Sequence, residues 1–201
     1  MAMKQVETAA PHAPTPEPSL SPTALRGRPL GEILAAIAGV SPDKVAEALV
    51  AQQADPAGLR FGETLVKAKL ATEEQVLRAL AIQLGLPFQA SIDAVEVPDD
   101  LARLVPINFA KTARVLPLGR DGDEIRVAVA DPLDTAAQDN LSVLLGAPLS
   151  PVVAPGAVIV DAINQVYDRT ADRHDRLMED LETTEDLESV AHELEEPTDL
   201  L

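Results

Sequence analysis

The sequence predicts an α+β fold in which a duplicated helical hairpin subdomain precedes a small α/β domain. Two observations support this prediction. A helical pattern occurs twice within residues 30–83 at a fixed spacing, and the chain then changes to β-branched runs around a glycine-containing turn. These features predict a roughly three-stranded sheet covered by helices. We therefore place the helical subdomain at residues 25–86 and the α/β domain at residues 87–168.

The two ends of the chain differ from the middle in composition. Residues 1–24 contain five prolines and few apolar side chains, so they cannot bury enough surface to offset the entropy cost of ordering. Residues 177–201 contain ten Asp or Glu and no Lys or Arg. We predict a disordered, proline-rich arm at residues 1–24 and an acidic linker or tail at residues 169–201.

Composition argues against several classes of protein. The net charge of −17 does not suit a surface that neutralises a phosphate backbone, so we expect no nucleic-acid partner. No apolar run reaches the roughly 20 residues that span a bilayer, so we expect no direct membrane insertion. The absence of cysteine is consistent with a cytoplasmic protein.

The sequence lacks the motifs of the common catalytic and metal sites. Lys111-Thr112 has no glycine at the distance that a phosphate-binding loop requires. The three histidines, His12, His174 and His192, all lie in the flanking polar segments. A core without histidine can assemble neither a His-based metal site nor a Ser-His-Asp arrangement. We therefore expect no enzyme activity, no catalytic residue and no bound metal.

The helical repeat appears when Leu30–Gln52 is placed over Phe61–Gln83. Residues then match at a constant offset of thirty-one without a gap, which indicates two copies of one supersecondary unit. The matched pairs include Gly31 with Gly62, Glu32 with Glu63, Leu34 with Leu65, Ser41 with Thr72, Val45 with Val76, Leu49 with Leu80 and Gln52 with Gln83.

Each copy is predicted to be a short helix, a turn and a longer helix. Ser41-Pro42 and Thr72-Glu73 are typical helix starts, because the hydroxyl can accept a backbone N–H that has no partner within the helix. Thr72 and Gln75 have the spacing of a capping box.

The α/β domain begins with predicted short helices in residues 98–113. Two β-branched runs around Gly119–Asp123 then predict a hairpin. Residues 148–155 form a third predicted strand, and Pro155 is expected to open the last helix.

Between the hairpin and the third strand, local signals predict a turn and a helix. Asp131, which precedes a proline, is typical of a turn. Asp134 is typical of a helix N-cap and Gly146 of a helix end. We assign both aspartates these structural roles and no catalytic one.

The order of these pieces resembles the N-terminal region of the secretion and pilus assembly ATPases, the GspE/PilB family. The repeat resembles the first N-terminal module through Arg-x-Gly, apolar pairs, a Ser/Thr cap and Ala-Leu-x-x-Gln before "LGLPF". The segments "RVAVADPLDTAAQDNLSVLLG" and "PVVAPGAVIVDAINQVYD" are similar to the second N-terminal domain. The acidic "HELEEPTDLL" resembles the linker before the ATPase core, most of all in the type II secretion member GspE.

The resemblance implies a docking and regulatory region that precedes a motor. In that family the full ATPase is a cytoplasmic hexamer, and its N-terminal domains bind the cytoplasmic part of an inner-membrane platform protein, called GspL in the type II system. We expect the chain to dock in this way, with Ile33, Ile37 and Val66 on the docking surface. Its location would be peripheral to the inner membrane, and ATP and Mg would bind only the motor domain.

Two alternative functions remain open. Some family members bind cyclic di-GMP through both copies of the repeat. If this chain does the same, the residues that match the family's binding motif are the candidate ligand contacts. The first copy departs from the family pattern, because Pro29 stands where the second copy has its arginine, and this favours docking. A stand-alone adaptor without an ATPase is the third reading. The cyclic di-GMP candidates are Arg28, Gly31, Gln52, Arg60, Gly62 and Gln83.

Overall fold

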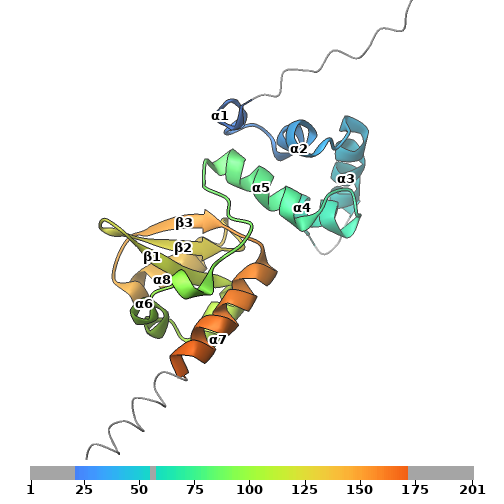
Figure 1. Ribbon diagram of the computed structural model, residues 1–201. Coiled ribbons are helices and arrows are strands. Elements are labelled where there is room, and N and C mark those ends of the chain that lie inside the picture. The colour runs from blue at the N-terminus through green and yellow to red at the C-terminus, as the bar shows by residue number, and fades with distance from the viewer. Residues whose placement is uncertain (1–20, 55–57, 172–201) are drawn as a thin grey trace, which may run out of the picture.

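The computed structural model describes residues 21–54 and 58–171 (Figure 1). Most of the predicted arm and of the predicted acidic linker therefore lies outside the described residues. Helix α1 (Pro22–Leu25) includes the last three residues that we had assigned to the arm. Leu25, the last residue of α1 and the first of the predicted helical subdomain, is buried in the core of the helical repeat.

The helical repeat contains two short helices and two longer ones. The first copy supplies α2 (Leu30–Ala38) and α3 (Pro42–Ala54), and the second supplies α4 (Phe61–Lys67) and α5 (Glu73–Leu84). Each short helix packs chiefly on the long helix of the other copy, α2 on α5 and α4 on α3. Aliphatic side chains fill the space between them. The buried cluster contains Leu25, Ile33, Leu34, Val40, Ala48, Leu65, Ala71, Val76 and Ala79.

The predicted capping box of the second copy is present. The Thr72 hydroxyl accepts the N–H of Gln75 at 3.2 Å, and the Gln75 amide oxygen accepts the N–H of Thr72 at 2.9 Å. At the other end of α5, Gly85 adopts the left-handed conformation typical of a helix C-cap. Local sequence signals therefore set both ends of this helix.

Glycine is required where each short helix meets the long helix of its own copy. A Cβ atom on Gly31 would lie 2.6 Å from Cγ1 of Val45, and one on Gly62 would lie 2.6 Å from Cγ1 of Val76. Real Cβ contacts are not this short, and valine has little freedom at χ1 to move away. The two copies share this contact at matching positions, so the sequence repeat is also a repeat of packing.

Two glutamine side chains join the copies reciprocally. Nε2 of Gln52 donates to the carbonyl of Leu59 at 3.0 Å, and Nε2 of Gln83 donates to the carbonyl of Arg28 at 2.8 Å. Arg28 lies three residues before Gly31, and Leu59 lies three residues before Gly62. The end of each copy is thus bonded to the start of the other, which gives the repeat an approximate two-fold symmetry.

The α/β domain has three strands and several helices, which confirms the predicted fold class. Strands β1 (Val115–Asp121) and β2 (Glu124–Val129) pair antiparallel, and β3 (Leu149–Val153) pairs parallel to β2. The order in the sheet is β1-β2-β3. The helical elements are η1 (Ala94–Glu96), α6 (Asp99–Leu104), α7 (Ile107–Ala113), α8 (Thr135–Leu145) and the helix over residues 156–171.

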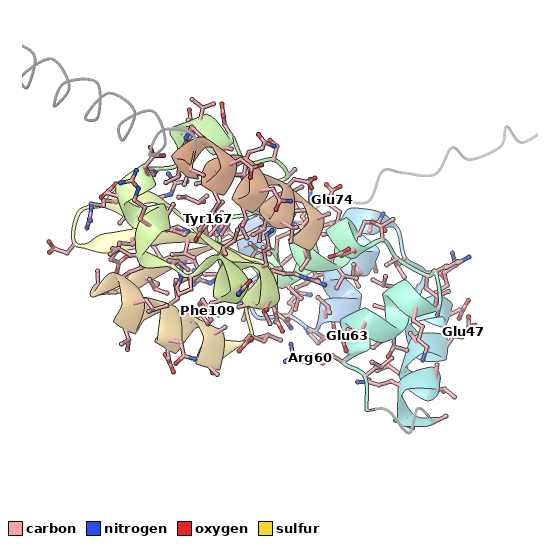
Figure 2. All side chains as sticks on the ribbon, turned by 90° about the horizontal axis from the view of Figure 1, so that it is seen from below. Glu47, Arg60, Glu63, Glu74, Phe109 and Tyr167 are labelled. Atoms are coloured by element: carbon pink, nitrogen blue, oxygen red, sulfur yellow. The ribbon has the colours of Figure 1, made fainter. Side chains whose placement is uncertain are left out.

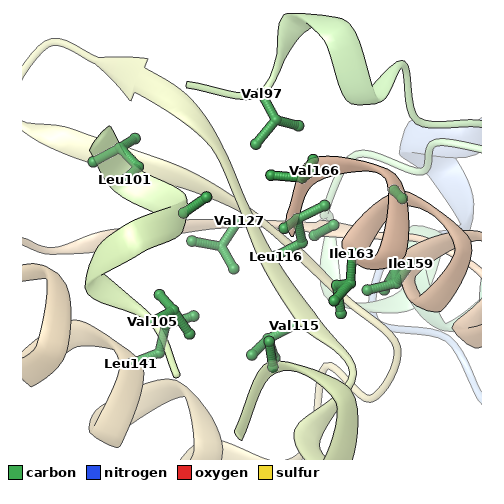
Figure 3. Packing of buried hydrophobic residues seen from close by; sticks show 14 of the residues in the cluster. Val97, Leu101, Val105, Val115, Leu116, Val127, Leu141, Ile159, Ile163 and Val166 are labelled. Atoms are coloured by element: carbon green, nitrogen blue, oxygen red, sulfur yellow. The ribbon is translucent and has the colours of Figure 1, made fainter. Parts of the chain in front are cut away.

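Helices cover both faces of the sheet (Figure 3). Leu116 pairs with Ala128, so Leu116 and Val127 point to opposite faces. Leu101 of α6, the α6 C-cap residue Val105 and Leu141 of α8 gather beside Val127. Ile159, Ile163 and Val166, from residues 156–171, gather beside Leu116. This core is built from Leu, Val, Ile and Ala, as the low aromatic content requires.

The second copy of the repeat packs on the α/β domain. Leu77 and Ala81 of α5 are buried against Val153 of β3, with Leu86 and Phe88 beside them. The segment after α5 extends the sheet, because the N–H of Val153 donates to Pro87 and its carbonyl accepts the N–H of Gln89, both at 2.9 Å. None of the described helices is long and apolar enough to cross a bilayer.

The last described helix is fastened to the start of the domain by polar side chains. The Tyr167 hydroxyl donates to the carbonyls of Ala102, at 3.0 Å, and Val105. Arg169 donates to the carbonyls of Ala94, at 2.6 Å, and Val97, at 2.8 Å, and pairs with Asp99 at 2.6 Å. These bonds hold the helix against η1 and α6.

Substitution of Gly62 by alanine is expected to destabilise the repeat. Helix propensity alone favours alanine over glycine by about 1 kcal/mol, but the clash with Val76 is expected to lower the free energy of unfolding by about 1–3 kcal/mol. Urea denaturation measures this change. Combining Gly62→Ala with Val76→Ala removes the clash, so the double variant should lose less than the sum of the single variants. A Gly62→Ala variant more stable than the wild type would contradict the packing role.

Tyr167 should make stability fall at alkaline pH. Burial raises the pKa of Tyr167 above its usual value of 10.0. A raised pKa in the folded state means that the stability contribution is complete below the unfolded pKa and is lost as pH rises through the folded one. Tyr167 is the one tyrosine of the chain, so tyrosinate absorbance titrates it directly. Tyr167→Phe should flatten the alkaline decline, whereas a titration that matches unfolded tyrosine would contradict this account.

Candidate functional site

A cavity of about 1040 Å³ lies between the helical repeat and the α/β domain. On the repeat side it is lined by α4, α5 and residues from the first copy. On the other side it is lined by the end of α7 and by the turn between β2 and α8. Figure 2 shows Arg60, the N-cap residue of α4, at the border between the repeat and the α/β domain.

The cavity brings together four of the six residues that the sequence suggested for a dinucleotide. Gln52, Arg60, Gly62 and Gln83 line it. The remaining two, Arg28 and Gly31, are not among its lining residues. The Arg28 side chain pairs with Glu32 at 3.4 Å on the surface, and only its backbone carbonyl reaches Gln83.

Matching positions of the two copies supply the apolar wall. Leu30 and Phe61 occupy the same position in the repeat, thirty-one residues apart, and both line the cavity. Val76, Leu77 and Leu80 extend this wall along α5. Sequence reasoning missed Leu30 and Phe61, although their alignment in the repeat was a signal that could have identified them.

Three of the four carboxylates that line the cavity accept backbone N–H groups, and the fourth is Glu73. Glu63 accepts the N–H of Arg60 at 2.8 Å, and Asp134 accepts the N–H of Ala137 at 3.0 Å. Asp131 accepts the N–H of Leu133 at 2.9 Å. The last two bonds confirm the turn and cap roles predicted for Asp131 and Asp134. Three cationic side chains also line the cavity. They are Arg60 at the N-cap of α4, Lys67 in α4 and Arg114 at the C-cap of α7.

An ion pair spans the cavity from one wall to the other. Nη1 of Arg60 lies 2.5 Å from Oδ2 of Asp131. The hydrogen bond and the charge of Asp131 raise the pKa of Arg60 above its usual value, so the guanidinium stays protonated. The two side chains are 54% and 42% exposed, so solvent screens the pair. The partners are 71 residues apart, and no local pattern predicted their contact.

The residues predicted for protein docking do not share one environment. Ile33 is fully buried, because α2 packs across α5, so its assignment to an exposed docking surface is wrong. Ile37 and Val66 are each 37% exposed. A larger exposed apolar surface lies on α3, where Leu49 is 44% and Val50 67% exposed.

Within the described part of the chain, no group of three or more acidic or histidine side chains is placed to hold a metal ion. The cavity instead offers an apolar wall, two glutamine amides and guanidinium groups. These groups suit a ligand that has planar rings, hydrogen-bonding edges and anionic oxygens.

Comparison with known proteins identifies the family. The model of the MshEN domain matches residues 84–173. A solved structure described as MshE with cdg is 36% identical in sequence, with a TM-score of 0.58, and the match covers 70% of this chain and 99% of that one. This coverage is more than residues 84–173 could supply, so the likeness extends into the helical repeat.

Curated relatives show the same region in longer proteins. The type IV pilus assembly ATPase PilB of Myxococcus xanthus is 33% identical over 138 residues, which cover 69% of this chain and 24% of PilB. The bacteriophage adsorption protein B of Escherichia coli K12 is 30% identical over 151 residues, which cover 75% of this chain and 20% of that protein. The chain thus spans about a quarter or less of the length of these relatives. It belongs to the MshEN domain family and is homologous to a region of the type IV pilus assembly ATPases.

Proposed function

We propose that this chain is the N-terminal regulatory region of a secretion or pilus assembly ATPase and binds cyclic di-GMP in the cavity between its two units. One observation carries the proposal: equivalent residues of both repeat copies line the cavity, Leu30 with Phe61 and Gln52 with Gln83. Cyclic di-GMP consists of two identical halves, so an approximately two-fold site can offer each half the same groups. The solved structure of MshE contains cyclic di-GMP, abbreviated cdg.

The cavity groups match the chemistry of the ligand. Guanine rings can lie against the apolar wall of Leu30 and Phe61. Each glutamine uses its amide nitrogen on a backbone carbonyl, which leaves the amide oxygen as an acceptor for guanine N–H groups. Arg60 supplies a guanidinium, which pairs well with phosphate oxygens.

Four carboxylates and three cationic side chains line the cavity, and three of the carboxylates already have backbone partners. Glu63 and Asp134 already accept backbone N–H groups, and Asp131 accepts one as well. Arg60, Lys67 and Arg114 lie around the same cavity. The matched glutamines and the Arg60 guanidinium in one cavity support binding of a dinucleotide more strongly than docking, which the sequence favoured.

In this proposal the chain binds a ligand and does not catalyse. It has no phosphate-binding loop, and a motor domain of the parent protein would bind ATP and Mg. Relatives named for two activities, pilus assembly and phage adsorption, share the region, as expected for a binding module. Membership of the type II secretion branch stays a prediction.

Calorimetry with cyclic di-GMP tests this function. The wild-type chain should bind, and Arg60→Ala should weaken binding by about 1–3 kcal/mol, the scale of one charge-assisted hydrogen bond. The control is Arg120→Ala, which removes an exposed arginine that pairs with Asp100 at 3.5 Å in the α/β domain. Absence of binding by the wild type, or equal losses in both variants, would contradict the proposed site.

A second candidate function, docking to the inner-membrane platform protein, is supported by the exposed face of α3. The repeat places Leu49 and Val50 at the positions of Leu80 and Ala81. In the second copy these positions pack against the α/β domain, whereas in the first copy they are exposed. The surface of Leu49 and Val50 on α3 is therefore suited to apolar packing and accessible to a partner. We propose that this partner is the cytoplasmic domain of a GspL-like protein.

A pull-down with that cytoplasmic domain tests the docking surface. Leu49→Ser combined with Val50→Ser should abolish capture, because the partner would lose its apolar contact. The control is Val95→Ser combined with Val143→Ser, which changes two valines that are 80% and 81% exposed on the α/β domain. If only the control pair loses capture, the docking surface belongs to the other unit.

A further inference from the structure

We infer that Arg114, at the C-cap of α7, is a further ligand-binding residue of the cavity and supplies the second guanidinium that a ligand with two phosphates needs. The inference rests on the proposed binding of cyclic di-GMP. It assigns to the α/β domain a contact that the first copy of the repeat does not provide. The two phosphates of the ligand would then bind arginines from different units.

The first copy of the repeat has no arginine equivalent to Arg60. Pro29 occupies the matching position, thirty-one residues earlier. The neighbouring Arg28 pairs with Glu32 at 3.4 Å on the surface and is not among the residues that line the cavity. Among the described residues of the repeat, Arg60 is the one arginine that lines it. A guanidinium for the second phosphate therefore has to come from another element.

Arg114 lines the cavity on the side of the α/β domain and is available for a ligand. The residue is exposed, and within residues 21–54 and 58–171 its side chain forms no hydrogen bond or ion pair. Arg60, by contrast, is already paired with Asp131. A guanidinium without a partner can bind phosphate oxygens without first giving up another contact.

The backbone of Arg114 has a conformation that glycine would adopt with less steric strain. Its φ of 51° and ψ of 57° lie in the left-handed region, where helices commonly end with glycine. The Arg114 N–H donates to the carbonyl of Ala110, and the Arg114 carbonyl accepts the N–H of Ala130 at 3.2 Å. The side chain contributes to neither bond, so local structure does not explain an arginine at this position.

Gly156, the first residue of the last described helix, leaves room for the Arg114 side chain. A Cβ atom on Gly156 would lie 3.0 Å from Cδ and 3.1 Å from Nη1 of Arg114, which is tighter than most real Cβ contacts. Gly156 does not have a positive φ, so its backbone conformation does not require glycine, which is a weak helix former. Two positions that each carry a local cost therefore meet at one guanidinium, as expected for a side chain placed to bind a ligand.

The matched experiment compares Arg114→Gly with Lys69→Gly in the full 201-residue chain, by calorimetry with cyclic di-GMP and by urea denaturation. Lys69 is the other described non-glycine residue with a positive φ, 56°, and it does not line the cavity. Both variants should be at least as stable as the wild type, because glycine relieves the left-handed backbone. Only Arg114→Gly should weaken binding, by about tenfold, the scale of a lost charge-assisted contact.

Two further variants test how Arg114 acts. Arg114→Lys keeps the charge but loses the planar fork, so it should weaken binding less than Arg114→Gly. If Arg60 and Arg114 bind different phosphates, the losses from Arg60→Ala and Arg114→Gly should add in the double variant. Losses that do not add would overturn the assignment of Arg114 to the second phosphate.

Gly156→Ala tests the placement of the guanidinium. It should weaken binding in the wild-type background, because the new methyl group crowds Arg114, and should have no effect in an Arg114→Gly background. Equal affinities of the wild type and Arg114→Gly, or equal losses in Arg114→Gly and Lys69→Gly, would overturn the inference while the binding proposal stands. Absence of binding by the wild type would overturn both.

Discussion

The close approach at Gly31 and Gly62 constrains the rest of the helical repeat. A Cβ atom on either glycine would lie 2.6 Å from a valine methyl group, so each short helix can lie directly on the start of its long helix. This position brings the copies close enough for Gln52 and Gln83 to bond to the opposite copy. A small core of buried aliphatic side chains then closes between α2 and α5, with Phe61 partly buried against it.

The two copies have similar packing but different surroundings. The α/β domain covers Leu77 and Ala81 of the second copy, whereas Leu49 and Val50 of the first copy remain exposed. One copy therefore joins the repeat to the sheet, and the other offers a similar surface to solvent. The cavity forms on the joined side, where the starts of both copies face the turn after β2.

The two proposed functions use different surfaces of the same molecule. The ligand cavity lies between the units, and the exposed apolar residues lie on α3. Apolar packing of α5 on β3 holds the units together, while the Arg60–Asp131 pair is exposed and screened. The apolar contact therefore contributes more to holding the units together than the exposed ion pair does.

Local signals in the sequence determined the order and ends of the main elements. The capping box of Thr72 and Gln75 and the cap at Asp134 depend on residues three positions apart. Neighbouring residues alone therefore specify these helix ends. The offset of thirty-one residues likewise revealed two equivalent units, and the family resemblance pointed to four of the residues that line the cavity.

Only the tertiary structure decided which surfaces are open and which distant side chains meet. Ile33 and Ile37 lie one helical turn apart, yet Ile33 is fully buried while Ile37, next to the end of α2, is 37% exposed. Helical spacing assigns both to one face but does not say how far the neighbouring helix covers it. The Arg60–Asp131 pair is separated by 71 residues and the Gln83–Arg28 bond by 55, and such contacts exist only because packing brings the two copies and the sheet together.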